Sequence, residues 1–464
     1  MFKRISIFCC ILATACTVGP NYEKVELYSD DEIKEELHLK EGNIIETDWF
    51  KQFNDNTLNK LIDLGRQNNT DIAIAISRLR QARANLNIDR TTNLPMINAQ
   101  GGYTYEKNSK NIGPTADADY FSIGFDASWE LDLWGKNRRQ IEADKAQIKG
   151  LEYTLKDIKV TLVSEIAKSY INLMQKIEEL YLTKRNISLQ KETLELVKSK
   201  YENGLTDEIS YNQAQYLLKN LEGQVPNIQS QIEEYKNSLS LLIGILPSEI
   251  PVDINKRSPI FKQSYKYNTK MVYNLPVSTI RNRPDVVATE QELIAQNALV
   301  GKAIAEIYPS INISALWGLA SINGSQLFNS NSQNYSYSPL IDAPLLDWNR
   351  LQNNVKIQKY IREEHLNKYK NTVRQAIVEL KNAMTIFQNN ITRNNKQIQA
   401  LNNINKVVSL SRDKYKNGLI EYSDLLQSEQ NLLDSQQQYI NGKAQIMQSV
   451  VAYYKACGGG YANN

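Results

Sequence analysis

Two carboxylates close behind a tight turn are the residues of this sequence best placed to do chemistry. Glu421 and Asp424 follow the Tyr-x-Asn-Gly segment at 415–418, and on a helix a spacing of three places both on one face. Several copies of such a pair around an axis would form an acidic ring, which attracts cations and repels anions. The alternative interpretation of both residues is a solvated helix face.

The sequence contains few residues that indicate catalysis or metal binding. His38 and His365 are the two histidines, and neither has a neighbouring pattern of metal ligands. No Ser-His-Asp set, glycine-rich phosphate loop or metal-ligand spacing is present, so we expect a protein that is not an enzyme and needs no metal or cofactor. Lys and Arg number 54 against 51 Asp and Glu, a net charge of +3. This balance excludes a nucleic-acid binder that works by bulk charge.

The N-terminus has the pattern of an export signal. A basic start at residues 1–4 precedes an apolar run at 5–13, and small residues then lead to Cys16. This resembles a bacterial lipobox, in which the cysteine receives a covalent lipid and becomes the mature N-terminus. Ala13 departs from the usual leucine of that motif, and the alternative is an ordinary signal peptide with an incidental cysteine. Thr17 at the next position favours the outer membrane.

An internal repeat organises the rest of the chain. Three motifs recur at one constant offset of 214 positions, which predicts two ungapped copies over roughly 69–246 and 283–460. The segment between them, 247–282, contains four prolines and is interpreted as a linker. The recurring motifs begin at the pairs Pro95 and Pro309, Leu131 and Leu345, and Lys200 and Lys414.

Each copy contains two stretches in which apolar and polar residues alternate. The clearest is 121–132, where Phe125 and Trp129 alternate with Asp126 and Glu130. Alternation with a period of two predicts half-buried strands. We expect four of them, at about 97–106, 121–132, 311–320 and 335–345.

Long helices follow each pair of strands. Apolar residues spaced by seven predict helices with coiled-coil packing over 135–201 and 349–415. Each ends at a Tyr-x-Asn-Gly turn, because glycine readily adopts the left-handed conformation that closes a helix. Helices over 206–246 and 420–457 then run back. Tyr201 and Tyr415 are the last heptad residues, and the turns contain Asn203, Gly204, Asn417 and Gly418.

Strands of ten to twelve residues with one apolar face suit a transmembrane β-barrel. Four strands are too few to close one, since the smallest barrels need about eight. An open edge inside a bilayer leaves backbone groups unsatisfied, so the strands have to come from more than one chain. Two chains would supply eight strands and three would supply twelve. The alternative is ordinary hairpins on a soluble sheet.

Several segments carry a resemblance to a known family. Cys16-Thr17-Val18-Gly19-Pro20-Asn21-Tyr22, Glu130-Leu131-Asp132-Leu133-Trp134-Gly135-Lys136, Arg283-Pro284-Asp285, Tyr308-Pro309-Ser310 and Gly458-Gly459-Gly460 match in order over nearly all of the mature chain. The sequence is similar to the TolC family, in the lipid-anchored branch that serves tripartite (RND-type) efflux pumps of Gram-negative bacteria. The resemblance implies a mixed, mainly α fold in which a homotrimer forms a twelve-stranded outer-membrane β-barrel continuous with a periplasmic α-barrel. A periplasmic adaptor protein, an inner-membrane pump and outer-membrane lipid are the partners implied.

The resemblance also suggests where a gate would lie. Asp424 corresponds to an inward-facing aspartate of relatives, so Asp424, Glu421, Tyr415 and Tyr201 are the candidate gate residues at the periplasmic end. Some relatives carry an arginine where Ile420 stands and a second aspartate where Gln427 stands. In the first copy, Ser210 takes the place of Asp424. The turn residues Asn203, Gly204, Asn417 and Gly418 are the expected contacts for the adaptor.

The leading hypothesis is therefore an outer-membrane exit duct for drugs or other small toxic compounds. The alternatives are a lipid-anchored periplasmic coiled-coil scaffold without a pore and a TolC-like duct for type I protein secretion. The domain organisation expected from the sequence is a signal peptide at 1–15, a lipid-anchored N-terminal segment at 16–56, a first repeat at 57–246, a linker or equatorial segment at 247–282, a second repeat at 283–460 and a tail at 461–464.

Overall fold

In a computed structural model the chain forms two compact units. The structure describes residues 17–40, 42, 47–107, 109, 111, 118–262 and 273–463, so Cys16 and the signal peptide lie outside the described residues. The first unit comprises Met1–Glu26, Ser77–Glu152 and Ala288–Asn371, and the second comprises Leu27–Ile76, Tyr153–Val287 and Thr372–Asn464. Each unit therefore draws on both predicted repeats.

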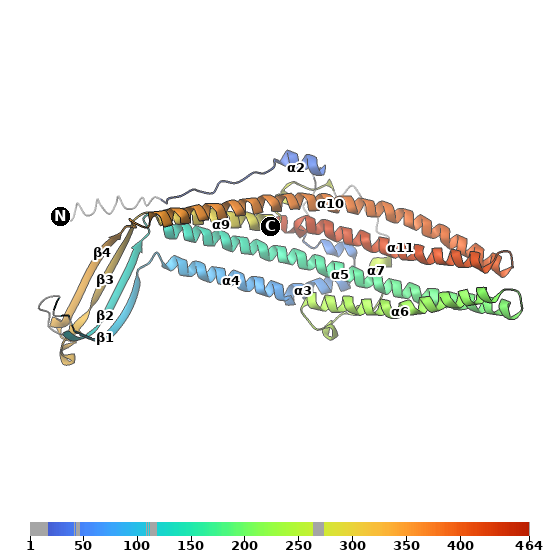
Figure 1. Cartoon of the computed structure of the whole chain (residues 1–464), viewed down its shortest axis with the longest axis horizontal. Coiled ribbons are helices and arrows are strands. Elements are labelled where there is room, and N and C mark those ends of the chain that lie inside the picture. Colours follow the sequence, from blue (N-terminus) through green and yellow to red (C-terminus); the bar gives the residue numbers. More distant parts are fainter. Residues whose placement is uncertain are drawn as a thin grey trace. The chain divides into compact units, whose positions relative to one another are not determined.

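The first unit contains one antiparallel sheet, in the order β1-β2-β3-β4 (Figure 1). Its strands are β1 Met96–Glu106, β2 Ala118–Leu131, β3 Ser310–Ser321 and β4 Gln333–Asp342. The last strand ends before the predicted limit of 345. Pro344 lies just beyond it, and a proline cannot donate a hydrogen bond to the neighbouring strand.

The register of the sheet places apolar residues together on one face. Phe125 of β2 lies opposite Ala99 of β1 and Trp317 of β3. The rings of Phe125 and Trp317 stack with their centroids 6.4 Å apart, and both side chains are more than half exposed. On the other face Asp126 lies opposite Asn98, which donates a hydrogen bond to it over 3.2 Å. An apolar face of this extent is typical of a surface that another molecule or a membrane covers.

This register gives a first testable prediction. Single cysteines placed along β2 at the positions of Asp126, Ser128 and Glu130 should react with a membrane-impermeant thiol reagent in intact membranes. Cysteines at Phe125, Ala127 and Trp129 should stay unreactive if their apolar face lies against lipid, as expected for a barrel strand. The native Cys457 is fully buried and gives little background. Equal labelling of both sets would contradict a barrel with one wet face and one lipid face.

Segments of four helices belong to the first unit together with the sheet. The helices are α4 Thr70–Thr91, α5 Lys136–Glu202, α9 Pro284–Ala305 and α10 Trp348–Lys416, and each extends into the second unit. The junction between β2 and α5 is held by Asp132, whose carboxylate accepts hydrogen bonds from the backbone N–H groups of Asn137 (3.2 Å) and Arg138 (3.0 Å). This carboxylate therefore satisfies backbone donors at the beginning of the helix, which have no partner within it.

The segment after Cys16, Thr17–Glu26, is bound to the first unit, and we call it the N-terminal strap. Arg139 is 3% exposed and donates to the carbonyl groups of Val18 (3.1 Å) and Gly19 (3.0 Å). Gly19 adopts a φ of +91° and lies directly against Gly301 of α9, where a Cβ atom would come within 2.5 Å of the Gly301 Cα. Only glycine fits at this close approach.

The second unit is helical and contains two long hairpins. One is formed by α5 and α6 Glu208–Ile243, and the other by α10 and α11 Tyr422–Ala456. The interior of this unit includes Phe50, Leu58 and Tyr170, which are almost fully buried. Shorter elements complete it: α2 Asp30–Leu37, η1 Trp49–Phe53, α3 Asn56–Asn68, η2 Pro247–Glu249, α7 Pro259–Lys262, α8 Ser278–Arg281 and η6 Gly458–Asn463.

The described part of the predicted linker is packed and partly helical. Asp55 caps α3 by accepting from the backbone N–H groups of Thr57 and Leu58, at 2.8 and 3.1 Å. The same buried carboxylate also accepts from the hydroxyl groups of Tyr170 (2.9 Å) and Ser258. The linker residue Ser258 is thereby tied to both α3 and α5.

A buried arginine joins the start of α9 to the two long helices of the second repeat. The guanidinium of Arg283 donates to Asp285 (2.7 Å), to Glu379 of α10 (2.9 Å) and to the carbonyl of Ala456 at the end of α11 (2.9 Å). Its side chain is only 8% exposed. Burial together with the neighbouring Asp285 raises the pKa of Asp157 to about 6, although Arg283 opposes that rise.

Among the described residues, none of the helices combines the length and the apolar character that crossing a membrane as a helix requires.

Candidate functional site

The two hairpin turns close as the glycine pattern predicts. Gly204 and Gly418 have φ values of +69° and +72°, in the left-handed region. In the first turn the N–H of Gly204 donates to the carbonyl of Tyr201 (2.9 Å), and the N–H of Leu205 donates to Lys200 (2.8 Å). These bonds satisfy carbonyl groups that the helix end leaves free.

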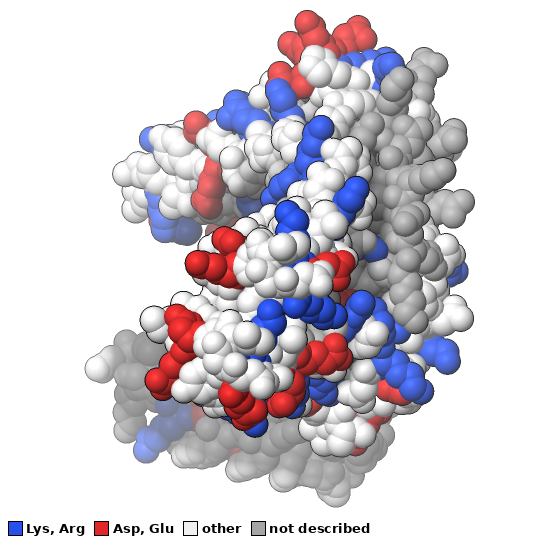
Figure 2. Space-filling view, turned by 90° about the vertical axis from the view of Figure 1, so that its right-hand side faces the viewer, with Lys and Arg blue, Asp and Glu red and all other residues white. Residues whose placement is uncertain are grey.

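The asparagine side chains also cap the helix ends at the two turns. The side-chain amide of Asn203 donates to the carbonyl of Ser199 over 2.7 Å, and that of Asn417 donates to Asp413 over 2.8 Å. Both asparagines are exposed. Figure 2 faces the end of the second unit where these turns lie and shows acidic and basic side chains interspersed there. The turns are thus rigid, exposed and mixed in charge.

The structure places the two candidate carboxylates differently from each other. Asp424 lies in the first turn of α11, whereas Glu421 is the residue just before the helix and has an extended backbone. Both side chains are exposed. α11 begins at Tyr422, two residues later than the predicted 420, so Glu421 is the N-cap residue and Asp424 is the third residue of the helix. The position of Asp424 also suits the positive end of the helix dipole, which stabilises a carboxylate without any gate function.

The two candidate tyrosines have different environments. Tyr415 is buried in an apolar cluster with Val197, Tyr422 and Leu425, and its ring meets that of Tyr422 edge to face at 5.7 Å. Tyr201 is 39% exposed and stacks on Tyr211 of α6 at 5.6 Å. Tyr415 thus braces the interior of the helix tips, while Tyr201 covers one edge of them.

A lysine ties the two hairpins together at the tips. The ammonium group of Lys200 on α5 donates to the backbone carbonyl of Tyr415 on α10 over 2.6 Å. It also lies 4.5 Å from the centroid of the Tyr415 ring, within the range of a cation–π interaction. The hairpin of α5 and α6 therefore contacts Tyr415, the last heptad residue of α10, through Lys200.

A buried ion pair at the tips was missed by sequence reasoning. Arg412 donates to the same oxygen of Glu429 from Nε (3.0 Å) and from Nη2 (2.8 Å), and the Glu429 side chain is 6% exposed. Burial raises the pKa of Glu429, while its hydrogen bonds with Arg412 lower it. The sequence does place Arg412 on the same helix face as the apolar heptad residues, because it lies four residues after Val408 and three before Tyr415. A charged residue on that face could have indicated a buried ion pair.

The described residues contain no cluster of three or more histidine, cysteine, aspartate or glutamate side chains that could hold a metal ion. Cys457 is fully buried, and burial raises the pKa of its thiol to about 12. A thiol with so high a pKa is a poor nucleophile.

The family model for outer membrane efflux proteins matches residues 61–245 and 275–459. The two matched segments begin 214 positions apart, the offset of the motif pairs. Together they cover most of the chain.

Individual relatives agree with this match over nearly their full length. The solvent efflux pump outer membrane protein SrpC of Pseudomonas putida is 27% identical over 413 residues, covering 88% of this chain and 87% of SrpC. The solved outer-membrane channel OprN superposes with a TM-score of 0.89 at 25% identity, over 96% of this chain and 100% of OprN. The Campylobacter jejuni CmeC outer membrane channel gives 0.86 at 26% identity, over 96% and 95%.

These relatives are channels, and what they share with this chain extends over the strands, the long helices and both hairpin turns. The chain therefore belongs to the outer membrane efflux protein family and is the outer-membrane exit duct of an efflux pump.

Proposed function

We propose that three copies of this chain close into one twelve-stranded barrel in the outer membrane, continued by a helical tube in the periplasm. The observation that carries the proposal is the four-stranded sheet, which has an apolar face and two open edges, β1 and β4. Unpaired backbone groups at those edges are too costly in a bilayer unless another copy pairs with them. Three copies supply the twelve strands that an aqueous lumen needs.

The proposed cargo is a set of small, drug-like or otherwise toxic compounds. The relative SrpC is named for solvent efflux, which supports small apolar molecules as substrates. A periplasmic adaptor and an inner-membrane pump would complete the conduit, with the turns around Asn203, Gly204, Asn417 and Gly418 as the contacts for the adaptor. The exposed, rigid form of these turns supports that role.

The size and conductance of the purified protein test this proposal. A homotrimer that forms stable ion-conducting pores in planar bilayers is the expected result. A protein of any size that never conducts would favour a periplasmic coiled-coil scaffold without a pore.

We further propose that Cys16 carries a covalent lipid. The export pattern of residues 1–15 and the small residues directly before Cys16 support this. In cells fed a labelled fatty acid, Cys16→Ser should abolish incorporation of label into the protein. The barrel would still anchor the variant, so export should fall only modestly. Unchanged labelling of the variant would place the lipid on a residue other than Cys16.

The acidic ring at the gate is proposed on Asp424, with a smaller part for Glu421. Two unit charges about 6 Å apart at an effective dielectric near 20 interact by roughly 3 kcal/mol, and salt reduces this in a wet pore mouth. Asp424→Ala should therefore lower cation selectivity and weaken block by a trivalent cation added from the periplasmic side. Glu421→Ala should do the same to a smaller extent. The measurement is the single-channel reversal potential in a salt gradient.

Asp63 offers a control for the gate residues. It is an exposed aspartate on α3, which lies against the end of α6 remote from the hairpin turn, as the hydrogen bond from Asn69 to the carbonyl of Leu242 shows. Asp63→Asn removes one carboxylate away from the tips and should leave selectivity unchanged. An unaltered reversal potential in the Asp424→Ala, Glu421→Ala double variant would remove both residues from the pore lining.

A further inference from the structure

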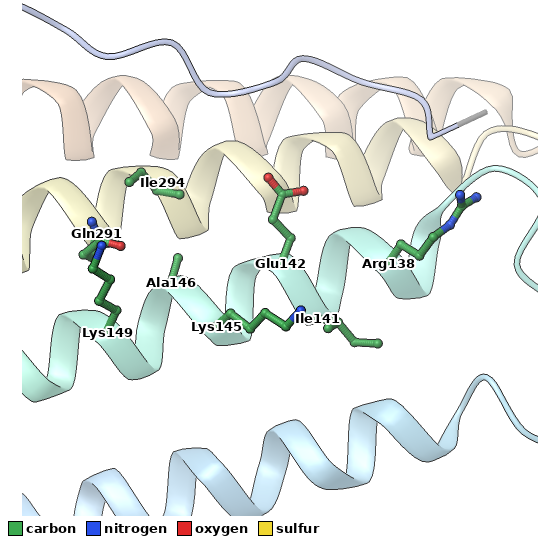
Figure 3. Close-up of a pocket in the computed structure, with 8 residues that line it drawn as sticks. All are labelled: Arg138, Ile141, Glu142, Lys145, Ala146, Lys149, Gln291 and Ile294. Atoms are coloured by element: carbon green, nitrogen blue, oxygen red, sulfur yellow. The ribbon is translucent and has the colours of Figure 1, made fainter. Parts of the chain in front are cut away.

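A groove on the first unit carries an excess of positive charge. It has a volume of about 470 Å³ and lies between α5 and α9 (Figure 3). Arg138, Lys145 and Lys149 line it from α5, beside the apolar side chains of Ile141 and, on α9, Ile294. The groove thus offers cations next to an apolar wall.

Two of the three cations are free to bind a ligand. The Glu142 carboxylate in the groove is paired with Arg139 over 2.7 Å, and Arg138 is paired with Asp132 over 3.2 Å. Lys145 and Lys149 are exposed, and in the part of the chain that the structure describes neither has an ion-pair partner. Their Cβ atoms are one helical turn apart, about 6 Å. Figure 3 shows the Lys145 ammonium group turned toward Ile141 and that of Lys149 toward Gln291, so both flexible side chains have to turn inward to contact one phosphate.

The groove opens on the side of α5 and α9 that carries the N-terminal strap. Asn297 on α9 donates to the carbonyl of Pro20 over 3.0 Å, and Ile294 lies one turn from Asn297. Arg139, which holds the strap, also holds Glu142 of the groove. An acyl chain on Cys16 can enter only the membrane outside the tube. This side is therefore the outer side, a step that rests on the proposed function.

The end of the groove at Arg138 lies close to the lipid anchor along the helix axis, while Lys145 and Lys149 lie ten and fourteen residues beyond Gly135, about 15 and 21 Å away. Arg138 is three residues beyond Gly135, whose backbone touches Thr17, the residue after Cys16. Basic pockets at the membrane surface bind anionic lipid headgroups through this combination of charge and adjacent apolar surface.

We propose that this groove binds the phosphate of an anionic phospholipid from the leaflet that holds the lipid anchor. Lys145 and Lys149 bind the phosphate oxygens, and Ile141 and Ile294 contact the glycerol and the first methylene groups. The bound lipid would fill the seam between α5 and α9 beside the strap.

Titration calorimetry on the full-length, detergent-purified protein tests this proposal. The probes are short-chain phosphatidylglycerol, phosphatidylcholine of the same chain length, and inorganic phosphate. Phosphatidylglycerol should bind, and the Lys145→Gln, Lys149→Gln double variant should weaken its affinity by about thirtyfold. Lys356→Gln, Lys359→Gln removes two exposed charges from α10 in the same unit and should leave the affinity unchanged.

Three results would overturn the proposal. Equal affinity for phosphatidylcholine would show that charge is not recognised. Inorganic phosphate binding as tightly as the lipid, with the same loss in the double variant, would make free phosphate the ligand. An equal loss in the α10 control would show that the effect is one of net charge. Conductance of the same sample separates the outcomes: a conducting protein that binds no phosphatidylglycerol contradicts this inference alone, and a non-conducting protein contradicts the proposed function.

Discussion

Replacing Arg283 with methionine is expected to lower the free energy of unfolding by about 2 to 3 kcal/mol, because the buried guanidinium donates to the half-buried Asp285 and to the carbonyl of Ala456, while its third partner, Glu379, is 58% exposed. The carboxylates of Asp285 and Glu379 and the carbonyl of Ala456 would lose the guanidinium that binds all three. Methionine retains much of the apolar stem, so the loss reports on the charge. The measurement is the unfolding midpoint of the helical circular dichroism signal in detergent.

Arg281 provides the matched control for Arg283. It pairs with Asp30 over 2.8 Å and donates to the carbonyl of Tyr28 over 2.8 Å, but the Asp30 side chain is 62% exposed. Exposed ion pairs contribute about 0 to 1 kcal/mol, so Arg281→Met should cost little. An equal loss for the two variants would mean that burial of the Arg283 network has no special role in stability.

The second large effect is expected at the helix tips. Arg412→Met leaves Glu429 as a buried carboxylate without its cation, which should destabilise the protein by about 3 kcal/mol. The Arg412→Met, Glu429→Gln double variant removes the charge and should recover most of that loss. A double variant as unstable as the single one would show that packing, not charge, is responsible.

The loss in Arg412→Met should also depend on pH. Burial already raises the pKa of Glu429, and Arg412 opposes that rise. Without Arg412 the pKa in the folded state rises further, so the folded protein holds a proton that the unfolded chain has released. Stability then falls as pH increases from the ordinary glutamate pKa to the folded-state value. The deficit of the single variant should therefore be smaller near pH 5 than at pH 8, measured against the wild-type protein at each pH.

The strands could be predicted from the sequence because their pattern is local. One face of each strand is apolar and the other polar, so alternation marks the strand and the residues that share a face, such as Phe125 and Trp129 of β2. The last strand ends earlier than predicted, at Asp342. Pro344 lacks a backbone N–H to donate to the neighbouring strand, and the alternation of apolar and polar residues does not reveal this. The glycine turns were predictable for the same local reason, since a positive φ is a property of one residue.

The candidate site was less predictable because its contacts join distant segments. The pairing of Arg412 with Glu429, and of Lys200 with the Tyr415 carbonyl, depends on how two hairpins pack. The start of α11 was predicted two residues early, at 420, because the residues around Glu421 do not mark the first helical residue and Glu421 makes no side-chain capping hydrogen bond. The direction in which Asp424 faces depends on the assembly, which the contacts of one chain do not specify.

The two open edges of the sheet have a genetic consequence. If β1 of each copy pairs with β4 of the next, a protomer with a defective β4 can still join the ring through its intact β1 and then leave the barrel unclosed. With equal amounts of variant and wild-type chains mixing at random into trimers, only about one in eight contains wild-type copies alone. Mutations at a strand edge should therefore be dominant-negative, whereas a loss of expression from one of two gene copies should be nearly silent.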